Sequence, residues 1–288
     1  MKKTILIIGS NGMAGHIISE YLSTFEDFNI LRVSRDNFNF KNSYTLDVSN
    51  FIEIKKLINN IKPSIVINAI GILNKDAETN PDKAILINSF IPHLLAKECS
   101  KISASLIHLS TDCVFSGNKG SYLENDFKDG LGFYAQSKAL GEVLYDKHLT
   151  IRTSIIGPDL KESGIGLFNW VLNQKYTITG YTEAIWGGVT TLELAKSINH
   201  IIRLNDFKLN LIQLTNGKKI SKFSLIEILN DVFSLKLNII ASSEYKVDKS
   251  LINTSNFIYQ VPDYKTMIVE MYDWILNHSE LYKHYNIL

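Results

Sequence analysis

The chain has 288 residues, 45% of them hydrophobic, which is enough for the core of one large domain or of one domain with a smaller partner. Thirty basic and 29 acidic residues give a net charge of +1, so the sequence lacks the basic footprint of a nucleic-acid-binding protein. It has two cysteines, no apolar run of membrane-spanning length and no metal-ligand spacing of histidines or cysteines, which predicts a cytoplasmic protein without disulfides, a membrane span or a metal site.

Residues 4–23 have the order strand, glycine loop, helix that a dinucleotide site requires. Residues 4–8 form a short apolar, β-branched run, and residues 16–23 carry apolar side chains at helical spacing. Between them the glycines are spaced G-x-x-G-x-x-G, which permits a tight turn and close approach of the backbone to a phosphate at the helix N-terminus. We expect five residues of this loop to contact the cofactor: Gly9, Asn11, Gly12, Met13 and Gly15.

The second predicted strand, residues 28–33, ends where a dinucleotide fold places the acid that binds the ribose of NAD. Ser34 and Arg35 stand at that point, and Asp36 follows them. A hydroxyl and a guanidinium suit a 2′-phosphate better than a free 2′-hydroxyl. The sequence therefore favours NADPH as the cofactor and leaves NADH open.

The first half of the chain continues the alternation of strands and helices. Strands are predicted at residues 44–46, 64–69, 105–109 and 149–153, and helices at residues 51–60, 82–100 and 132–147. This alternation predicts an α/β fold with a doubly wound, Rossmann-like parallel sheet. The strand ends and the turns after them add Asp47, Ala69 and Gly71 to the expected cofactor contacts. Asn88 lies within a predicted helix, where it either hydrogen-bonds towards the site or is a polar residue of the helix packing.

The candidate catalytic groups lie between residues 105 and 142. Thr111 ends a strongly apolar strand, and Tyr134 and Lys138 are four residues apart on a predicted helix, so they share one face. In such a trio the phenol protonates a ketone oxygen, the ammonium lowers the phenol pKa, and the threonine orients the carbonyl. A Tyr-x-x-x-Lys pair also arises on solvated helices, but the upstream threonine and the glycine loop favour catalysis.

The regular alternation ends after residue 153, where Gly157-Pro158 predicts a turn out of the sheet. Helices are predicted at residues 165–174, 192–204, 222–233 and 264–277, and short strands at residues 176–179, 211–214 and 237–240. We expect residues 1–155 to form the NAD(P)-binding domain. Residues 156–288 are expected to form a smaller, interleaved and mainly substrate-binding domain, with some segments returning to the sheet. Tyr282, His284 and Tyr285 are predicted to lie in a surface tail.

Together these motifs resemble the extended short-chain dehydrogenase/reductase superfamily and, within it, the dTDP-4-dehydrorhamnose reductase family. The resemblance rests on four stretches: Leu109-Ser-Thr-Asp-Cys-Val-Phe-Ser-Gly117, Tyr122-x-Glu-x-Asp126, Tyr134-x-x-Ser-Lys-x-x-Gly-Glu142 and Arg152-Thr-Ser-Ile-Ile-Gly-Pro158. It implies NAD(P)H-dependent reduction of the 4-keto group of a nucleotide-linked 6-deoxyhexose for surface polysaccharide precursors. It also implies catalytic roles for Thr111, Tyr134 and Lys138, and cofactor contacts for Tyr134 and Lys138, with Lys138 on the nicotinamide ribose.

Departures from the family pattern bear on the substrate. Asp112-Cys113 stands where related 4,6-dehydratases have Asp-Glu, which speaks against dehydration. The resemblance assigns Asp112 and Cys113 to the substrate side, but the family usually has Tyr at position 113 and Gly where Ala135 stands, so the exact substrate stays open. Trp186 lies where family substrate loops run, and it either stacks on a base or sugar or is a buried structural residue.

Two other functions stay open beside the reductase. An epimerase of the same fold would keep its cofactor tightly bound. A non-catalytic NADP-binding regulatory subunit is the second, because the same resemblance includes a regulatory partner of methionine adenosyltransferase. The intact trio of Thr111, Tyr134 and Lys138 favours catalysis over pure binding. The base, the sugar, the stereochemistry at C4 and homodimer formation are not decided by the sequence.

Overall fold

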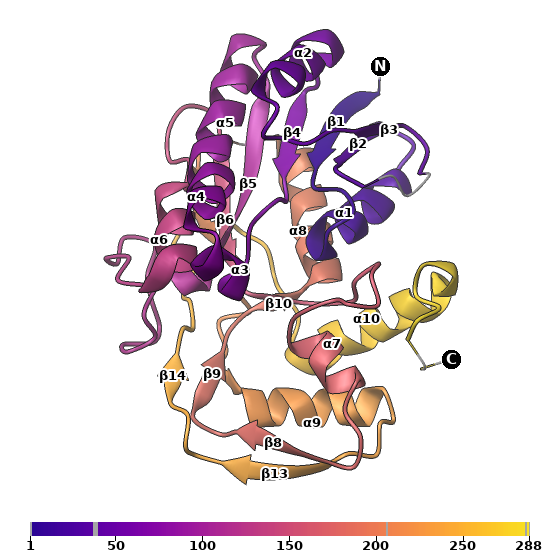
Figure 1. Cartoon of the computed structure of the whole chain (residues 1–288), viewed down its shortest axis with the longest axis vertical. Helices are drawn as coiled ribbons and strands as arrows, with labels where there is room; N and C mark the ends of the chain where they lie inside the picture. Colours follow the sequence, from indigo (N-terminus) through magenta and orange to yellow (C-terminus); the bar gives the residue numbers. More distant parts are fainter. Residues whose placement is uncertain (1, 37–39, 206, 286, 288) are drawn as a thin grey trace.

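The protein is built on a seven-stranded parallel sheet with the order β11-β6-β5-β4-β1-β2-β3 (Figure 1). The computed structural model describes residues 2–36, 40–205, 207–285 and 287. The strands of the sheet are β1 (Lys3–Ile8), β2 (Phe28–Ser34), β3 (Ser43–Thr45), β4 (Ile65–Asn68), β5 (Ser105–Thr111), β6 (Leu149–Thr153) and β11 (Leu211–Gln213). The predicted doubly wound fold is confirmed, and the carboxyl ends of the strands meet at one edge, where such folds bind ligands.

Helices cover both faces of the sheet because both faces are apolar. In β1, Ile5 and Ile7 pack into one core and Leu6 and Ile8 into the other, as the two-residue period of a strand requires. On the first face lie α1 (Met13–Ser23) and α8 (Thr191–Leu204), and on the second α2 (Phe51–Ile61) and α5 (Ile91–Lys101). Among the described residues, no helix has both the length and the apolar character needed to cross a membrane.

The predicted helix at residues 82–100 is observed as three joined segments. They are α4 (Pro81–Ala84), the π-helical segment η1 (Ile85–Phe90) and α5. Pro92 in the first turn of α5 has no N–H group to donate to the Asn88 carbonyl four residues earlier. Gly141 passes against that same carbonyl oxygen, 1.8 Å from where a Cβ at Gly141 would lie. The irregular turn therefore makes room for the chain that follows the candidate catalytic helix.

That candidate catalytic helix, α6 (Gly132–Leu140), is shorter than the predicted helix at residues 132–147. The close passage of Gly141 ends it, and the chain then turns inward, so that Val143 exchanges hydrogen bonds with the Thr150 hydroxyl at 3.0 Å. Leu140 and Leu144 lie within the predicted helix range at apolar positions, but both side chains are exposed. The prediction was wrong here because the apolar pattern continues past the point where packing against Asn88 stops the helix.

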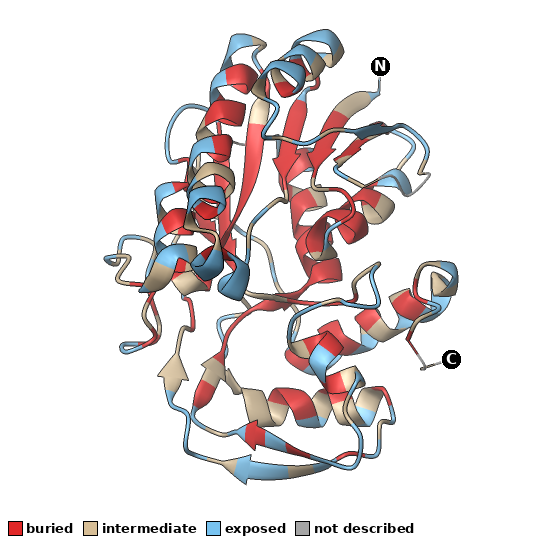
Figure 2. Ribbon diagram, viewed as in Figure 1, coloured by how far each residue is buried: buried red, intermediate tan, exposed pale blue. Residues whose placement is uncertain are grey.

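Residues after β6 alternate between the sheet and a smaller lower unit (Figure 1). The elements of the lower unit are β7 (Ile155–Ile156), α7 (Leu167–Leu172), β8 (Thr177–Tyr181), β9 (Ala184–Trp186), β10 (Val189–Thr190), β12 (Ile220–Ser221), α9 (Lys222–Val232), β13 (Asn238–Ser242), β14 (Val247–Asp248) and α10 (Tyr264–Asn277). Its core is continuous with the core beneath α1 and α8, so the unit is fixed to that side of the sheet. Its outermost strand, β13, is largely exposed (Figure 2).

The C-terminal stretch is not a surface tail, as the sequence predicted. After η3 (Ser279–Leu281), Tyr282 is fully buried, and its hydroxyl lies 2.9 Å from Nε2 of His16 and accepts a hydrogen bond from Trp274. Burial lowers the pKa of His16 to about 4, so this imidazole is neutral and needs no counter-charge. The end of the chain therefore packs against the helix that follows the glycine loop.

Candidate active site

The glycine loop between β1 and α1 is shaped by two close backbone contacts. Gly9 has φ +86°, and a Cβ there would lie 2.6 Å from the Ile70 side chain and 3.0 Å from the Ala69 carbonyl carbon. A Cβ at Gly15 would lie 2.0 Å from the Gly9 oxygen, whereas one at Gly12 would meet that oxygen at an ordinary 3.4 Å. Gly9 and Gly15 are therefore sterically required, and the loop lies beside the predicted cofactor contact Ala69.

The end of β2 is tied to this loop through polar side chains. The Asn11 amide donates to the Ser34 hydroxyl and to the Asp36 carbonyl, both at 2.8 Å. Arg35 is 75% exposed, with its Nε 3.9 Å from the Asp36 carboxylate, and Lys161 approaches the same carboxylate at 2.7 Å. Two cations, Arg35 and Lys161, thus stand at the strand end where the sequence predicts a 2′-phosphate.

The other predicted cofactor contacts lie along the same edge. Leu46 donates its N–H to the Ser34 carbonyl at 2.9 Å, which brings the next residue, Asp47, close to the end of β2. Asp47 itself accepts two hydrogen bonds from Ser49. The segment after Gly71 is held by Asn88, whose amide bonds both backbone groups of Ile72 and also donates to Ser137 of α6 at 3.0 Å. Asn88 therefore clamps the cofactor edge to the candidate catalytic helix.

Thr111, Tyr134 and Lys138 converge at the carboxyl end of β5. The Thr111 hydroxyl accepts from the Cys113 N–H and donates to the Asp112 carboxylate, both at 3.1 Å, and it acts to lower the pKa of the Tyr134 phenol. The Lys138 ammonium is buried and donates to the Leu109 carbonyl at 2.6 Å. The predicted trio is thus assembled by one strand end, the short η2 (Asp112–Val114) and α6.

The protonation of the trio differs from the expectation in one respect. Burial raises the pKa of Tyr134, and a hydrogen bond with Thr111 opposes this rise only in part. The sequence predicted that the Lys138 ammonium lowers the phenol pKa, but that ammonium is bonded to the Leu109 carbonyl. Burial lowers the pKa of Lys138 to about 8, against the opposing effect of the Glu142 carboxylate. The phenol therefore keeps its proton at neutral pH, as a proton donor must.

This geometry agrees with a comparison of the sequence with known families. The family model described as RmlD substrate binding domain matches residues 1–172, which is more than half of the chain. The chain belongs to the dTDP-4-dehydrorhamnose reductase-like family. The resemblance to extended short-chain dehydrogenases/reductases that the motifs indicated is thereby confirmed.

Curated relatives match about half of the chain in sequence. The dTDP-4-dehydrorhamnose reductase of Escherichia coli strain K12 is 32% identical over 156 residues, which are 52% of this chain and 50% of that protein. The beta subunit of methionine adenosyltransferase 2 from Xenopus tropicalis is 30% identical over 140 residues, 48% of this chain and 41% of that subunit. The chain thus spans about half the length of the curated relatives it matches.

A solved structure matches nearly the whole chain. The dTDP-4-dehydrorhamnose reductase of Bacillus anthracis strain Ames, crystallised in complex with NADP, superposes with a TM-score of 0.81 at 21% identity. The match covers 95% of this chain and 99% of that one. This likeness confirms that the lower unit, and not only the sheet, has the fold seen in the reductase-like family.

The predicted substrate-side residues have distinct surroundings. Asp112 is buried, which raises the pKa of its carboxyl against the effects of Lys249 and the Thr111 hydrogen bond. Burial also raises the pKa of Cys113 to about 11, so its thiol stays protonated. Trp186 is only 6% exposed, and its indole N–H donates to the Ser154 hydroxyl at 2.9 Å. Of the two open interpretations of Trp186, its surroundings favour the buried structural one.

Sequence reasoning missed the segment that caps α6. The short helix α3 (Asn74–Thr79) carries Glu78, whose carboxylate accepts the Tyr134 backbone N–H at 3.1 Å. Gly132, with φ +86°, leaves room for this carboxylate, which would lie 2.6 Å from a Cβ at that position. An acid at the helix N-terminus is stabilised by the free N–H groups and the helix dipole. Glu78 therefore holds the backbone that carries Tyr134.

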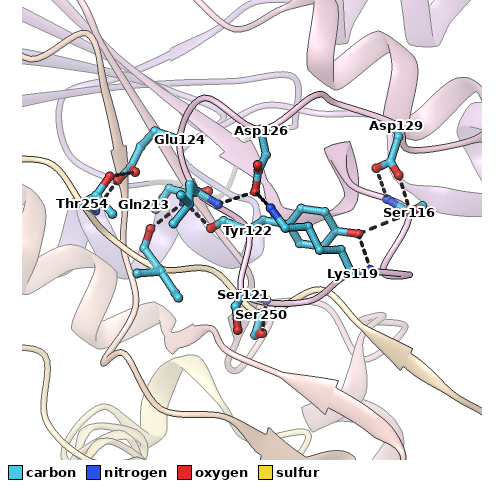
Figure 3. A network of polar contacts seen from close by, with 12 residues as sticks. Ser116, Lys119, Ser121, Tyr122, Glu124, Asp126, Asp129, Gln213, Ser250 and Thr254 are labelled. Carbon is cyan, nitrogen blue, oxygen red and sulfur yellow. Dashed lines mark hydrogen bonds and ion pairs between the residues drawn. The ribbon is translucent and has the colours of Figure 1, made fainter.

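The loop at residues 116–131 is ordered by Tyr122 and by contacts with the lower unit (Figure 3). The Tyr122 ring stacks on Phe115, with centroids 4.1 Å apart, and its hydroxyl accepts the Gly117 and Lys119 N–H groups. The Tyr122 backbone bonds Ser250 and Ile252, and its carbonyl also accepts from the Gln213 amide at 2.8 Å. Residues 250–252 are thus fastened directly to the loop that follows β5 and η2.

Beneath this loop lies a buried ion pair. Arg152 donates through Nε and Nη2 to the two carboxylate oxygens of Glu142, each at 2.9 Å, and through Nη1 to Gln213 at 3.1 Å. Ser110 and Lys128 also donate to the Glu142 carboxylate, at 2.8 and 3.0 Å. Burial acts to raise the pKa of Glu142, but the hydrogen bond and charge of Arg152 outweigh it and hold the pKa low.

Two lysines of the lower unit also reach the site and were not predicted. Lys249 lies against the loop, since its Cγ would be 3.0 Å from a Cβ at Gly117. The charges of Lys249 and Lys222 both act on the Asp112 carboxyl. No local motif marks either lysine, so only the fold brings them to the site of this reductase-like protein.

Proposed function

We propose that the protein reduces the 4-keto group of a nucleotide-linked 6-deoxyhexose, with NADPH as the reductant and Tyr134 as the proton donor. The observation that carries the proposal is the placement of Thr111 at the end of β5, with Tyr134 and Lys138 one turn apart on α6 and Lys138 bonded to the β5 carbonyl of Leu109, at the sheet edge that holds the glycine loop. Membership of the dTDP-4-dehydrorhamnose reductase-like family supports the same reaction. The product would be a precursor of surface polysaccharide.

The residues at the sheet edge fit a dinucleotide phosphate. Gly9 and Gly15 allow the backbone to approach the pyrophosphate, and the N-terminus of α1 directs N–H groups towards it. Arg35 and Lys161 supply two cations where the 2′-phosphate of NADPH would lie, which supports NADPH over NADH. Asn11 holds this region in place through Ser34 and Asp36.

Each member of the trio has one task in the reaction. Bound NADPH supplies a hydride to the carbonyl carbon of the sugar. Tyr134 gives its phenolic proton to the carbonyl oxygen, so that the ketone becomes an alcohol and the side chain becomes a phenolate. The Lys138 ammonium and the Thr111 hydroxyl stabilise that negative charge, which develops only as the proton leaves. Tyr134 regains a proton before the next turnover.

The division of labour in the chain follows from this proposal. Residues 1–155 would bind the cofactor and carry the trio, and residues 156–288 would supply most of the substrate site, with α8 and β11 returning to the sheet. Asp112 and Cys113 would face the sugar from the end of β5. A cytoplasmic location and homodimer formation stay predictions of the sequence.

The test is an absorbance assay of NADPH and NADH oxidation with a panel of nucleotide-linked 4-keto-6-deoxysugars. We expect one sugar nucleotide to be reduced, and Tyr134→Phe to lower kcat by about 10²–10⁴-fold without changing NADPH affinity. Full turnover by Tyr134→Phe would overturn the role of the phenol. If the protein binds NADPH but oxidises it with no member of the panel, this substrate class is excluded.

The same preparation separates the two alternatives. A sugar-nucleotide epimerase would carry near-stoichiometric nucleotide through purification, because its cofactor is regenerated in every cycle. A regulatory subunit would bind NADPH but oxidise it with no member of the panel. The match to a methionine adenosyltransferase beta subunit is the observation that keeps this second alternative under test.

A further inference from the structure

Lys222 and Lys249 directly follow two strands of one small sheet of the lower unit, β12 and β14, which run in opposite directions on the two sides of β9. Lys222 directly follows β12 and begins α9, and Lys249 directly follows β14. Both strands border β9, and Ser221 and Asp248 pair with the same residue of β9, Ile185. The two lysines therefore stand on either side of β9, at the surface of the lower unit that meets the candidate active site.

The backbone beside Lys249 is fastened to the loop that follows the catalytic strand. The Asp248 N–H donates to the Gly117 carbonyl at 2.8 Å. The Ser121 N–H donates to the Ser250 hydroxyl at 2.9 Å, and Figure 3 shows these two residues side by side. Lys249 lies between these two anchors, with its Cγ against Gly117. These two hydrogen bonds therefore fix the backbone of Lys249 against the loop that follows Thr111.

The two lysines differ from their neighbours in having no anionic partner. Lys219 pairs with Asp248 at 2.7 Å and Lys119 with Asp126 at 2.6 Å. Within the part of the chain that the structure describes, neither Lys222 nor Lys249 makes an ion pair or a side-chain hydrogen bond, although both are half-buried. The carboxyl on which their charges act, Asp112, is buried and hydrogen-bonded to Thr111.

Lys222 also occupies an unfavourable helix position. It is the first residue of the 11-residue helix α9, where the helix dipole disfavours a cation. A cation kept there, half-buried and unpaired, is costly unless an anion binds beside it. Lys249 provides the second positive charge on the same surface. Two such charges next to a site for a sugar match the diphosphate that links a sugar to a nucleoside.

We propose that Lys222 and Lys249 bind the diphosphate of the nucleotide-sugar substrate. The proposal rests on the proposed function, because it takes the sugar to lie between the lysines and Tyr134. The lysines would hold the substrate by its anionic linker, and the trio would act on the ketone beyond it. They would contribute to substrate affinity and orientation, and not to the affinity for NADPH.

Calorimetry with the full chain tests the subsite without requiring turnover. A nucleoside diphosphate, titrated into the NADPH-saturated protein, should bind the wild type and bind Lys222→Gln or Lys249→Gln about 10-fold more weakly, with a larger loss in the double variant. Lys246→Gln, an exposed lysine on the same segment, is the matched control and should bind as the wild type does. NADPH affinity should be unchanged in all variants.

Three outcomes would overturn the proposal: no binding of nucleoside diphosphate by the wild type, equal binding by the double variant, or an equal loss of NADPH affinity. Where the sugar nucleotide is reduced, KM should rise about 10-fold per lysine while kcat stays within about twofold. Lysine-dependent diphosphate binding without reduction of any sugar nucleotide would retain the subsite and refute the proposed reaction.

Discussion

Two cations lie buried beneath the candidate active site, and their surroundings differ. Arg152 donates to both oxygens of the Glu142 carboxylate at 2.9 Å and to Gln213 at 3.1 Å. Lys138 lies four residues before Glu142 in the sequence but donates to a neutral carbonyl, that of Leu109, at 2.6 Å. The charge of Arg152 is matched by direct contact. The charge of Lys138 is not, and burial lowers its pKa to about 8.

The comparison separates a charge that holds the fold from one that would serve the proposed reaction. A guanidinium cannot lose its proton in a protein and binds a carboxylate in a fixed, two-pronged geometry, so Arg152 is suited to a permanent anchor. An ammonium shifts its pKa readily when buried, so Lys138 can respond to charge developing beside it. Glu142 affects both groups, since it pairs with Arg152 and raises the pKa of Lys138.

The largest effect should come from removing the anchor. Arg152→Met leaves the buried Glu142 carboxylate without its bidentate partner, with only Ser110 and Lys128 remaining. We expect a loss of about 3 kcal/mol in the free energy of unfolding, because the buried carboxylate loses its bidentate partner and is left with the single ion pair to Lys128. Urea denaturation of the wild type and the variant measures this difference.

A double variant provides the control for the anchor. Glu142→Gln combined with Arg152→Met removes both charges, so most of the lost stability should return. A loss below about 1 kcal/mol in the single variant, a value typical of exposed ion pairs, would show that the buried pair is not the anchor we describe.

Lys138→Met should have the opposite effect on stability. The folded-state pKa of Lys138, about 8, lies below its ordinary value of 10.5, so the unfolded chain binds more protons between these pH values. The wild type should therefore gain about 3 kcal/mol of stability from this group as pH rises from 8 to 10.5, and the variant should lack that gain. Denaturation at several pH values tests this, and parallel curves for the two proteins would contradict it.

The same variant should lose turnover although its fold is retained. Without the ammonium, the phenolate formed on Tyr134 is not stabilised, so kcat should fall while NADPH still binds the glycine loop. Loss of activity together with unchanged or higher stability at pH 7 is the signature that separates Lys138 from Arg152. Arg152→Met should instead lose stability first.

The cofactor edge and the trio could be predicted because their signals are local. The glycine spacing from Gly9 to Gly15 lies in one loop, and Tyr134 and Lys138 are separated by a single helical turn. Contacts between distant segments could not be predicted in this way, since Arg152 of the anchor reaches Gln213 across 61 residues and Lys161 reaches Asp36 across 125. Such contacts depend on how the lower unit returns to the sheet, which no short pattern records.

The end of α6 shows a second limit of sequence patterns. Apolar residues continue at helical spacing beyond Gly141, so the pattern predicts a helix to residue 147. The stop is set by the Asn88 carbonyl, which Pro92 leaves without its helical donor and against which only a glycine fits. The inward turn that results is what brings Glu142 to Arg152. A packing contact between distant segments thus decides where the anchor lies.

The smallest predicted effect concerns Glu142 as the link between the two cations. The charge of the Glu142 carboxylate raises the pKa of Lys138, whereas His108 near it is neutral because burial keeps its pKa well below the usual value, so Glu142 is the anion that favours the ammonium. Activity should fall as pH rises through the pKa of Lys138, near 8 in the wild type. In Glu142→Gln this fall in kcat/KM should begin about one pH unit lower, because the charge that raises the Lys138 pKa is gone.

Ser110→Ala is the matched control for this shift. It removes a neutral hydrogen bond to the Glu142 carboxylate at 2.8 Å but leaves the carboxylate charge in place. We expect its pH profile to match that of the wild type, even if its stability falls slightly. If Glu142→Gln loses activity equally at every pH, the carboxylate acts only through the Arg152 anchor. The catalytic and structural cations would then be electrostatically independent, although they are separated by a single side chain.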